Sequence, residues 1–302
     1  MISHAVPARQ VVHLRDGRTL SYLELGAPSG IPVLFTIGSP SSAIGALGFA
    51  ASAERHGVRL ISIDKPGYGR STRDPKRTLQ RYGADLAELT DALGLDRVAV
   101  AGQSGGGPHA IAAAFVLGDR VSTLTLIASA GPLAEPWARA GLNPVMRTMT
   151  WFARNVPVLL GVPVAAMGLM LGNPERLERL AKRHEHKLTD TERALMQAPE
   201  MPLIAQGIQD AFASGRPGVK DEFRAIGREW GFRLEDVKAP TQVWHGTADK
   251  SCPIAMARQL AARLPNATLH ELDGLGHNFF GEPLDAAFAA IARPIQPVLP
   301  AP

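Results

Sequence analysis

The sequence predicts an α/β fold: a mostly parallel, eight-stranded sheet with helices on both faces and an inserted helical cap. In the first half of the chain, short apolar runs alternate with amphipathic stretches, the order in which strands and helices follow one another in a parallel sheet. Between residues 132 and 234 the alternation stops, and from residue 235 it resumes. With 302 residues, 45% hydrophobic and 20% charged, the chain has the composition of a soluble globular protein.

The expected strands are eight apolar runs. The first two flank an Asp16-Gly17 turn, which is a strong hairpin signal, so they should be antiparallel strands at one edge of the sheet. The other six alternate with helical patterns and should be parallel. In chain order the runs are Val11–Leu14, Thr19–Leu25, Val33–Thr36, Arg59–Ile63, Val98–Ala101, Val121–Ile127, Thr241–Trp244 and Thr268–Leu272.

Four helical patterns should cover the two faces of this sheet. The first two end at glycines, Gly94 and Gly118, as helices commonly do. The four patterns are Leu79–Leu93, Pro108–Leu117, Ile254–Leu264 and Pro283–Ala292. The chain then divides into a core over residues 1–131 and 235–293, a helical cap over residues 132–234, and a proline-rich extended tail over residues 294–302.

The most apolar stretch of the chain, Val156–Leu171, lies in the expected cap. It contains two prolines and is shorter than the roughly 20 apolar residues that a membrane-spanning helix needs, so we expect no insertion into a membrane. We expect it instead to be buried or to line a pocket. Plain helix packing would explain it, but a methionine-rich wall would also adapt to apolar substrates. The methionines in and near it are Met146, Met149, Met167 and Met170.

Charge and cysteine content limit the partners and the compartment. The formal net charge is +4 and the basic residues are dispersed, whereas a nucleic-acid surface gathers Lys and Arg on one face. The single cysteine, Cys252, allows no intramolecular disulfide, and the first residues lack the apolar core of a signal peptide. We therefore expect a cytoplasmic protein that binds no nucleic acid. Its apolar cap surface is compatible with a homodimer.

The segment Gly102–Gly106, Gly-Gln-Ser-Gly-Gly, stands between an expected strand and an expected helix. This is the G-x-S-x-G pattern in the context that a nucleophile elbow requires, with the hydroxyl of Ser104 above the end of the sheet. The backbone N–H of Gly105 would point to a developing oxyanion. The pattern needs no third glycine, so Gly107 should allow another segment, such as the Asp64–Ser71 loop or the cap, to approach closely.

A serine hydroxyl is a weak nucleophile without a base. His277 follows the last expected strand on a glycine-flanked loop, and Asp249 follows the strand before it. The chain order Ser, Asp, His is the one that accompanies this elbow. We therefore expect Ser104 to attack, His277 to take and return the proton, and Asp249 to orient the imidazole.

With these motifs the chain resembles the α/β-hydrolase fold superfamily, over nearly its whole length outside the cap. Residues Asp64–Ser71 match the family's D-x-P-G-x-G-x-S segment, a structural signature to which we assign no catalytic role. The resemblance implies that Ser39, after Gly38, gives the second N–H of the oxyanion hole beside Gly105. Where the family commonly has His-Gly-x-Pro, this chain has isoleucine, Ile37, in place of the histidine. The backbone N–H donors survive this change, so the hole is still expected, but isoleucine does not give the loop the hydrogen bonds that such a histidine would.

Other polar residues are weaker candidates. His245 could be the base and Asp273 the acid, but each lies at a strand end where packing explains it as well. His184-Glu185-His186 resembles a metal motif, yet residues i and i+2 do not share a helix face. Cys252 should be a small buried thiol. We expect no metal and no cofactor.

These residues predict a serine hydrolase that cleaves a carboxylic ester or a lactone with an apolar moiety through an acyl-serine intermediate. The same triad also serves C–C bond hydrolases, aminopeptidases or amidases, and perhydrolases, because one fold hosts many reactions. An alternative from another class is a receptor-like protein that binds a small ligand and turns it over slowly.

Overall fold

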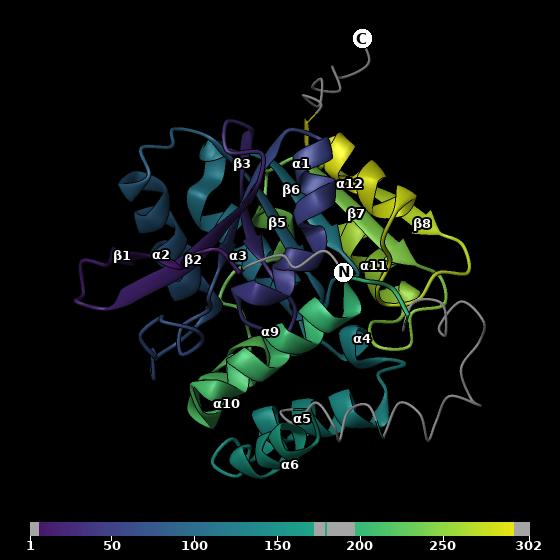
Figure 1. The fold of residues 1–302 in the computed structure, drawn as a ribbon. Coiled ribbons are helices and arrows are strands. Elements are labelled where there is room, and N and C mark those ends of the chain that lie inside the picture. Colours follow the sequence, from purple (N-terminus) through teal and green to yellow (C-terminus); the bar gives the residue numbers. More distant parts are fainter. Residues whose placement is uncertain (1–5, 172–178, 180–196, 293–302) are drawn as a thin grey trace.

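A computed structural model describes the protein over residues 6–171, 179 and 197–292. Eight strands form one sheet in the order β1-β2-β4-β3-β5-β6-β7-β8 (Figure 1). β2 runs antiparallel to β1 and β4, and the remaining neighbours are parallel, which confirms the predicted sheet. The bounds are β1 Gln10–His13, β2 Thr19–Gly26, β3 Ile31–Thr36, β4 Val58–Ile63, β5 Val98–Gln103, β6 Val121–Ile127, β7 Thr241–Gly246 and β8 Ala267–Leu272.

Helices cover both faces of the sheet, as expected, and each face has its own apolar core. α2 (Leu79–Ala92), α3 (Gly107–Leu117) and α11 (Ile254–Arg263) pack on one face. η1 (Ala43–Phe49), α1 (Ala50–Arg55) and α12 (Glu282–Ala292) pack on the other. The sequence did not predict η1 and α1, because their small residues and glycines leave little helical periodicity. β5 lies in the middle of the sheet and all six of its residues are buried, which explains its unbroken apolar run.

The described secondary-structure elements of the segment between β6 and β7 are all helices, joined by turns and loops. Its elements are α4 (Pro136–Arg139), α5 (Pro144–Asn155), α6 (Gly161–Leu171), α9 (Met201–Ala213), α10 (Arg216–Gly227) and η5 (Leu234–Asp236). Figure 1 shows α5 and α6 on the side of α10 that faces away from the sheet. The domain limits at residues 132 and 234 stay a prediction, and the proline-rich tail at 294–302 lies outside the described residues.

The expectation that Val156–Leu171 is buried is wrong for much of this stretch, which ends in α6. Val158, Val162 and Leu169 are 76%, 65% and 56% exposed, while Leu160 and Val164 are buried. α6 packs one side against α5, α9 and α10, so the opposite side of this almost wholly apolar helix faces outward. No helix in the described part of the chain is long and apolar enough to cross a membrane.

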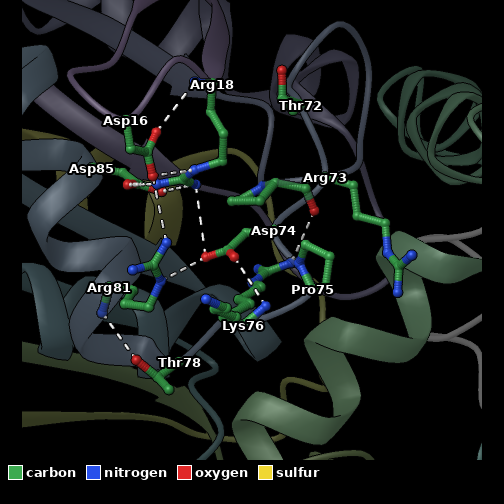
Figure 2. A network of polar contacts seen from close by, with 12 residues as sticks. Asp16, Arg18, Thr72, Arg73, Asp74, Pro75, Lys76, Thr78, Arg81 and Asp85 are labelled. Atoms are coloured by element: carbon green, nitrogen blue, oxygen red, sulfur yellow. Dashed lines mark hydrogen bonds and ion pairs between the residues drawn. The ribbon is translucent and has the colours of Figure 1, made fainter.

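A polar network fastens the β1–β2 hairpin to α2 (Figure 2). Both terminal nitrogens of Arg18 donate to Asp85, at 2.8 and 2.5 Å, and its Nε donates to Asp16 at 2.8 Å. Arg81, also on α2, donates to Asp74 at 2.8 Å. Paired charge-assisted bonds of this kind hold geometry well. The network therefore fixes the edge of the sheet and the chain that follows the Asp64–Ser71 loop.

Candidate active site

The predicted site residues gather at the carboxyl end of the parallel strands. Ser104 follows β5, Asp249 follows β7 and His277 follows β8. Parallel strands present their carboxyl ends at the same edge of a sheet, where α/β proteins place their ligands. The sheet order β5-β6-β7-β8 brings the three loops within reach of one another.

Ser104 has a strained backbone. Its φ angle is +54°, in the left-handed region that residues other than glycine rarely occupy. The glycines around it permit close packing, since a Cβ on Gly106 would lie 1.9 Å from the carbonyl oxygen of Thr36, and one on Gly102 would lie 2.5 Å from that of Gly106. The surrounding backbone thus holds Ser104 in a conformation that projects its hydroxyl from the end of β5.

The three candidate catalytic side chains are in hydrogen-bond contact. The Oγ of Ser104 lies 2.8 Å from Nε2 of His277, and Nδ1 of His277 lies 2.8 Å from Oδ2 of Asp249. This is the geometry of a nucleophile, a base and an orienting acid in that order. Asp249 is buried, while His277 keeps about a fifth of its side chain exposed, at 21%.

Asp249 is held in its charged form. Its Oδ1 accepts the backbone N–H groups of Ser251 and Cys252 at 2.7 and 2.9 Å, and its Oδ2 lies 3.3 Å from Nε2 of His245. Burial alone would raise the pKa of Asp249, but hydrogen bonds from His245 and His277 outweigh it, so the pKa lies well below its usual range. The carboxylate therefore stays ionised to favour an imidazolium at His277.

The weaker candidates lie elsewhere. His245 donates from Nε2 to the carbonyl oxygen of Cys252 at 2.6 Å and sits behind Asp249, so it is no base for Ser104. Asp273 accepts from the hydroxyl of Thr247 at 3.2 Å on an exposed turn. Cys252 is buried, which raises the pKa of its thiol well above its usual value.

The segment His184-Glu185-His186, where we expect no metal site, lies outside the described part of the chain. Over residues 6–171, 179 and 197–292, no group of three or more His, Cys, Asp or Glu side chains is arranged to hold a metal ion.

The two residues expected to form an oxyanion hole, Ser39 and Gly105, lie side by side. A Cβ on Gly105 would stand 3.2 Å from the backbone nitrogen of Ser39 and 2.4 Å from its hydroxyl oxygen. Gly38 also lies close to the nucleophile, since a Cβ on Gly38 would lie 3.1 Å from Cβ of Ser104. The loop after β3 therefore packs directly against the residues that precede α3.

A buried polar cluster beneath this loop was not predicted. Nζ of Lys65 donates to the carbonyl oxygens of Ile37 and Gly38 at 3.0 and 2.9 Å. The same nitrogen lies 2.7 Å from Oε1 of Glu222 on α10, which also accepts the hydroxyl of Ser39 at 2.6 Å. The sequence gives one signal for Lys65: it follows the apolar run Arg59–Ile63 and lies inside the Asp64–Ser71 motif. Nothing in a single sequence links it to Glu222.

Two cavities open on either side of Ser104. The larger holds about 150 Å³ and is lined by Ile37, Gly38, Ser39, Pro40, Ser41, Phe49, Gln103, Ser104, Ile204, Ile208, His277 and Asn278. The smaller, more enclosed one holds about 40 Å³ and is lined by Ser39, Ser104, Gly105, Ala130, Leu133, Met146, Phe223, Ile226, Ser251 and Cys252. Among these described lining residues there is no Asp, Glu, Lys or Arg. The space around Ser104 is therefore apolar to weakly polar.

Gly107 does permit a close approach, as predicted, but the segment that approaches is different. A Cβ on Gly107 would lie 1.8 Å from Oγ and 2.7 Å from Cβ of Ser129, just after β6. Neither the Asp64–Ser71 loop nor the helical insertion fills that place. β6 lies beside β5 in the sheet, so its continuation passes directly over the first turn of α3.

Substituting Gly107 by alanine should therefore destabilise the protein by about 1–3 kcal/mol, since a methyl group has no room against Ser129. Urea unfolding of Gly107→Ala measures the loss, and the double variant with Ser129→Gly should recover part of it. Gly161→Ala is the matched control, because a Cβ there meets nothing within 4 Å. Equal stability of Gly107→Ala and the wild type would contradict the contact.

Comparisons with known proteins identify the family of the chain. Residues 32–284 match the sequence model of a family described as alpha/beta hydrolase fold. The chain is 26% identical over 294 residues to 2-hydroxy-6-oxononadienedioate/2-hydroxy-6-oxononatrienedioate hydrolase 2 of Pseudomonas putida, covering 91% of this chain and 92% of the relative. It is 28% identical over 273 residues to the non-heme chloroperoxidase of Streptomyces lividans, covering 87% and 90%. The structure of an alpha/beta hydrolase fold protein from Nakamurella multipartita is similar with a TM-score of 0.66 and 24% identity, covering 94% of this chain and 99% of that one.

Proposed function

Because the chain belongs to the alpha/beta hydrolase fold family and is an enzyme, we propose that it is a serine hydrolase that cleaves a carboxylic ester or lactone with an apolar moiety. The observation that carries the proposal is the chain of contacts from Ser104 through His277 to Asp249, with 2.8 Å at each step. The small-molecule substrate, the cytoplasmic location, the lack of nucleic-acid and membrane partners and a homodimer stay predictions.

The geometry supports acyl transfer in two steps. Oγ of Ser104 attacks the substrate carbonyl carbon while Nε2 of His277 takes the hydroxyl proton, and Asp249 stabilises the imidazolium that forms. The backbone N–H groups of Ser39 and Gly105 bind the oxyanion. His277 then gives its proton to the leaving alkoxide, and a water molecule, activated by the same imidazole, hydrolyses the acyl-serine.

The cavities suggest where the two halves of the substrate lie. The leaving alkoxide must lie at His277, which lines the larger cavity, so we assign the alcohol part to that cavity. The acyl part then occupies the smaller cavity beside Gly105 and Cys252. A volume of about 40 Å³ is room for about three to four small groups, since one water-sized sphere needs roughly 10–15 Å³. The preferred substrate therefore has a short acyl group and a larger apolar alcohol.

A substrate screen tests this assignment of the two cavities. With p-nitrophenyl esters, kcat/KM should fall steeply from acetate and propionate to octanoate, because longer chains do not fit the smaller cavity. With alkyl acetates it should rise as the alcohol grows. Met146→Ala should extend the accepted acyl length, while Ile208→Ala, in the larger cavity, should not. Equal activity on acetate and octanoate would contradict this assignment, and rapid multiple turnover would rule out the slow ligand-binding protein.

A C–C bond hydrolase is the second candidate, supported by the relative from Pseudomonas putida. The substrate in its name has a ketone, a hydroxyl and two carboxylates but no ester or amide, so its hydrolysis must break a C–C bond. A dicarboxylate calls for cationic partners. Because none of the described lining residues is Lys or Arg, the ester or lactone is the better supported substrate. Assay with a dienedioate of this type alongside the esters compares the two.

A further inference from the structure

The loop after β3 lacks the histidine that the resemblance leads one to expect, and a lysine holds it instead. Lys65, at the end of β4, is wholly buried and donates to two successive carbonyl oxygens of the loop, those of Ile37 and Gly38. The side-chain oxygen of Gln103 accepts the N–H of Gly38 at 3.1 Å. Both ends of the Ile37–Gly38 peptide unit are thus fixed.

The second of these carbonyls bears directly on the oxyanion hole. The carbonyl of Gly38 and the N–H of Ser39 belong to one trans peptide unit, which is planar, so they point in opposite directions. When Lys65 binds that carbonyl oxygen, it also fixes the direction of the N–H of Ser39 on the other side. A cation on the carbonyl oxygen polarises the peptide as well, which makes the N–H a stronger donor.

A buried ammonium needs a partner of opposite charge, because desolvation penalises it heavily. That partner is Glu222, itself wholly buried, with 2.7 Å between Nζ and Oε1. Its other oxygen accepts the hydroxyl of Tyr68, and Arg77 lies 3.8 Å away. Burial alone would raise the pKa of Glu222, but Lys65 and Arg77 outweigh it and lower the pKa to about 2, so the carboxylate is ionised.

Glu222 also contacts the loop itself. Its Oε1 accepts the hydroxyl of Ser39 at 2.6 Å, which fixes the side chain of the same residue whose N–H is assigned to the oxyanion hole. Glu222 comes from α10, in the segment inserted between β6 and β7, while Lys65 comes from the core. The loop is therefore held from both parts of the protein at once.

We propose that Lys65 and Glu222 are positioning residues that lock the Gly38–Ser39 peptide with its N–H toward the oxyanion, so that α10 completes the oxyanion hole. This inference rests on the proposed hydrolase function. Neither residue lines a cavity beside Ser104, so both act through the loop and not on the substrate.

The same helix provides a matched control. Asp221 is next to Glu222, is also buried, and is also paired with arginines, at 2.6 Å to Arg73 and 3.2 Å to Arg224. Figure 2 shows Arg73 extending away from the Arg18 network, in the direction opposite to Asp16 and Asp85. No bond joins Asp221 to the loop after β3 among the described contacts, so its loss tests only the anchoring of α10.

The experiment compares Glu222→Gln with Asp221→Asn. For each, kcat and KM are measured on p-nitrophenyl acetate, and Ki is measured for an alkylboronic acid, which forms an anionic tetrahedral adduct on the serine. We expect Glu222→Gln to lower kcat by about 10- to 100-fold, less than the loss of a whole oxyanion donor, with KM changed by less than about threefold. Its Ki for the boronic acid should rise by a similar factor. Asp221→Asn should change all three by less than about threefold.

If Glu222→Gln does not fold, Lys65→Met tests the same inference. Lys65→Met removes the donor to Gly38 and leaves Glu222 near Arg77, so the carboxylate keeps a cationic neighbour. It should reproduce the fall in kcat and the weaker boronate binding. Unchanged kcat and Ki in the folded variants, or an equal loss in Asp221→Asn, would overturn the inference alone. Failure of a fluorophosphonate to label Ser104 of the wild type would overturn the proposed function and the inference together.

Discussion

Replacing Ser104 by alanine is expected to lower kcat for p-nitrophenyl acetate by at least about 10⁴-fold, because the hydroxyl of Ser104 is the one that contacts the base His277 among the described residues that line the two cavities. Oγ of Ser104 is the atom in contact with Nε2 of His277, and it stands between the two cavities. The substitution removes only the side-chain hydroxyl and leaves the backbone hydrogen bonds in place, so the midpoint of urea unfolding should change little.

Labelling provides an independent measurement for this variant. A fluorophosphonate should add one phosphonyl group to the wild type, detected by intact mass, and none to Ser104→Ala. Ser122→Ala is the control, since that hydroxyl donates to the carbonyl of Val98 on a neighbouring strand, far from the elbow. Residual turnover of Ser104→Ala near the wild-type rate would remove Ser104 as the nucleophile.

Replacing Asp249 by asparagine should lower kcat by about 10³- to 10⁴-fold with little change in KM. The amide keeps the shape of the carboxylate but carries no charge, so it no longer stabilises an imidazolium at His277. It also leaves the N–H groups of Ser251 and Cys252 with a weaker acceptor. Steady-state kinetics on p-nitrophenyl acetate measures the effect.

The matched control for this variant is Asp273→Asn. Asp273 is the other carboxylate close to His277 in the sequence, and its side chain accepts the hydroxyl of Thr247 on an exposed turn. Its loss should leave kcat within about threefold of the wild type. If the two variants exchanged these outcomes, the acid would be Asp273 and the hydrogen bond from His277 to Asp249 would be structural.

The features that the sequence predicts correctly are those that depend on a few neighbouring residues. The hairpin at Asp16-Gly17 and the elbow at Ser104 each need only a few neighbouring residues, and both are found where the pattern places them. α1 and η1 were missed because alanine and glycine leave no apolar periodicity. The exposed side of α6 was not predicted, because a helix that is apolar on all sides has no sequence pattern that tells which side packs against its neighbours.

Contacts between distant segments were the least predictable. The sequence indicated that Gly107 meets something close, but only the register of β5 and β6 decides that it meets Ser129. The pair of Lys65 and Glu222 joins the core to the inserted helices, and each residue by itself looks like an ordinary surface charge. Burial of such a pair is a property of the folded chain and has no counterpart in composition or spacing.

The place of Glu222 also limits how freely the inserted region can be exchanged between relatives. A chimera that takes its helices from a protein without an acidic residue at this point would leave Lys65 and Arg77 buried without that carboxylate. Such a graft would lose stability and activity through its core and not at the graft boundary, even with perfectly joined ends. Recombination that keeps this protein's activity has to inherit residue 222 together with residue 65, as one unit.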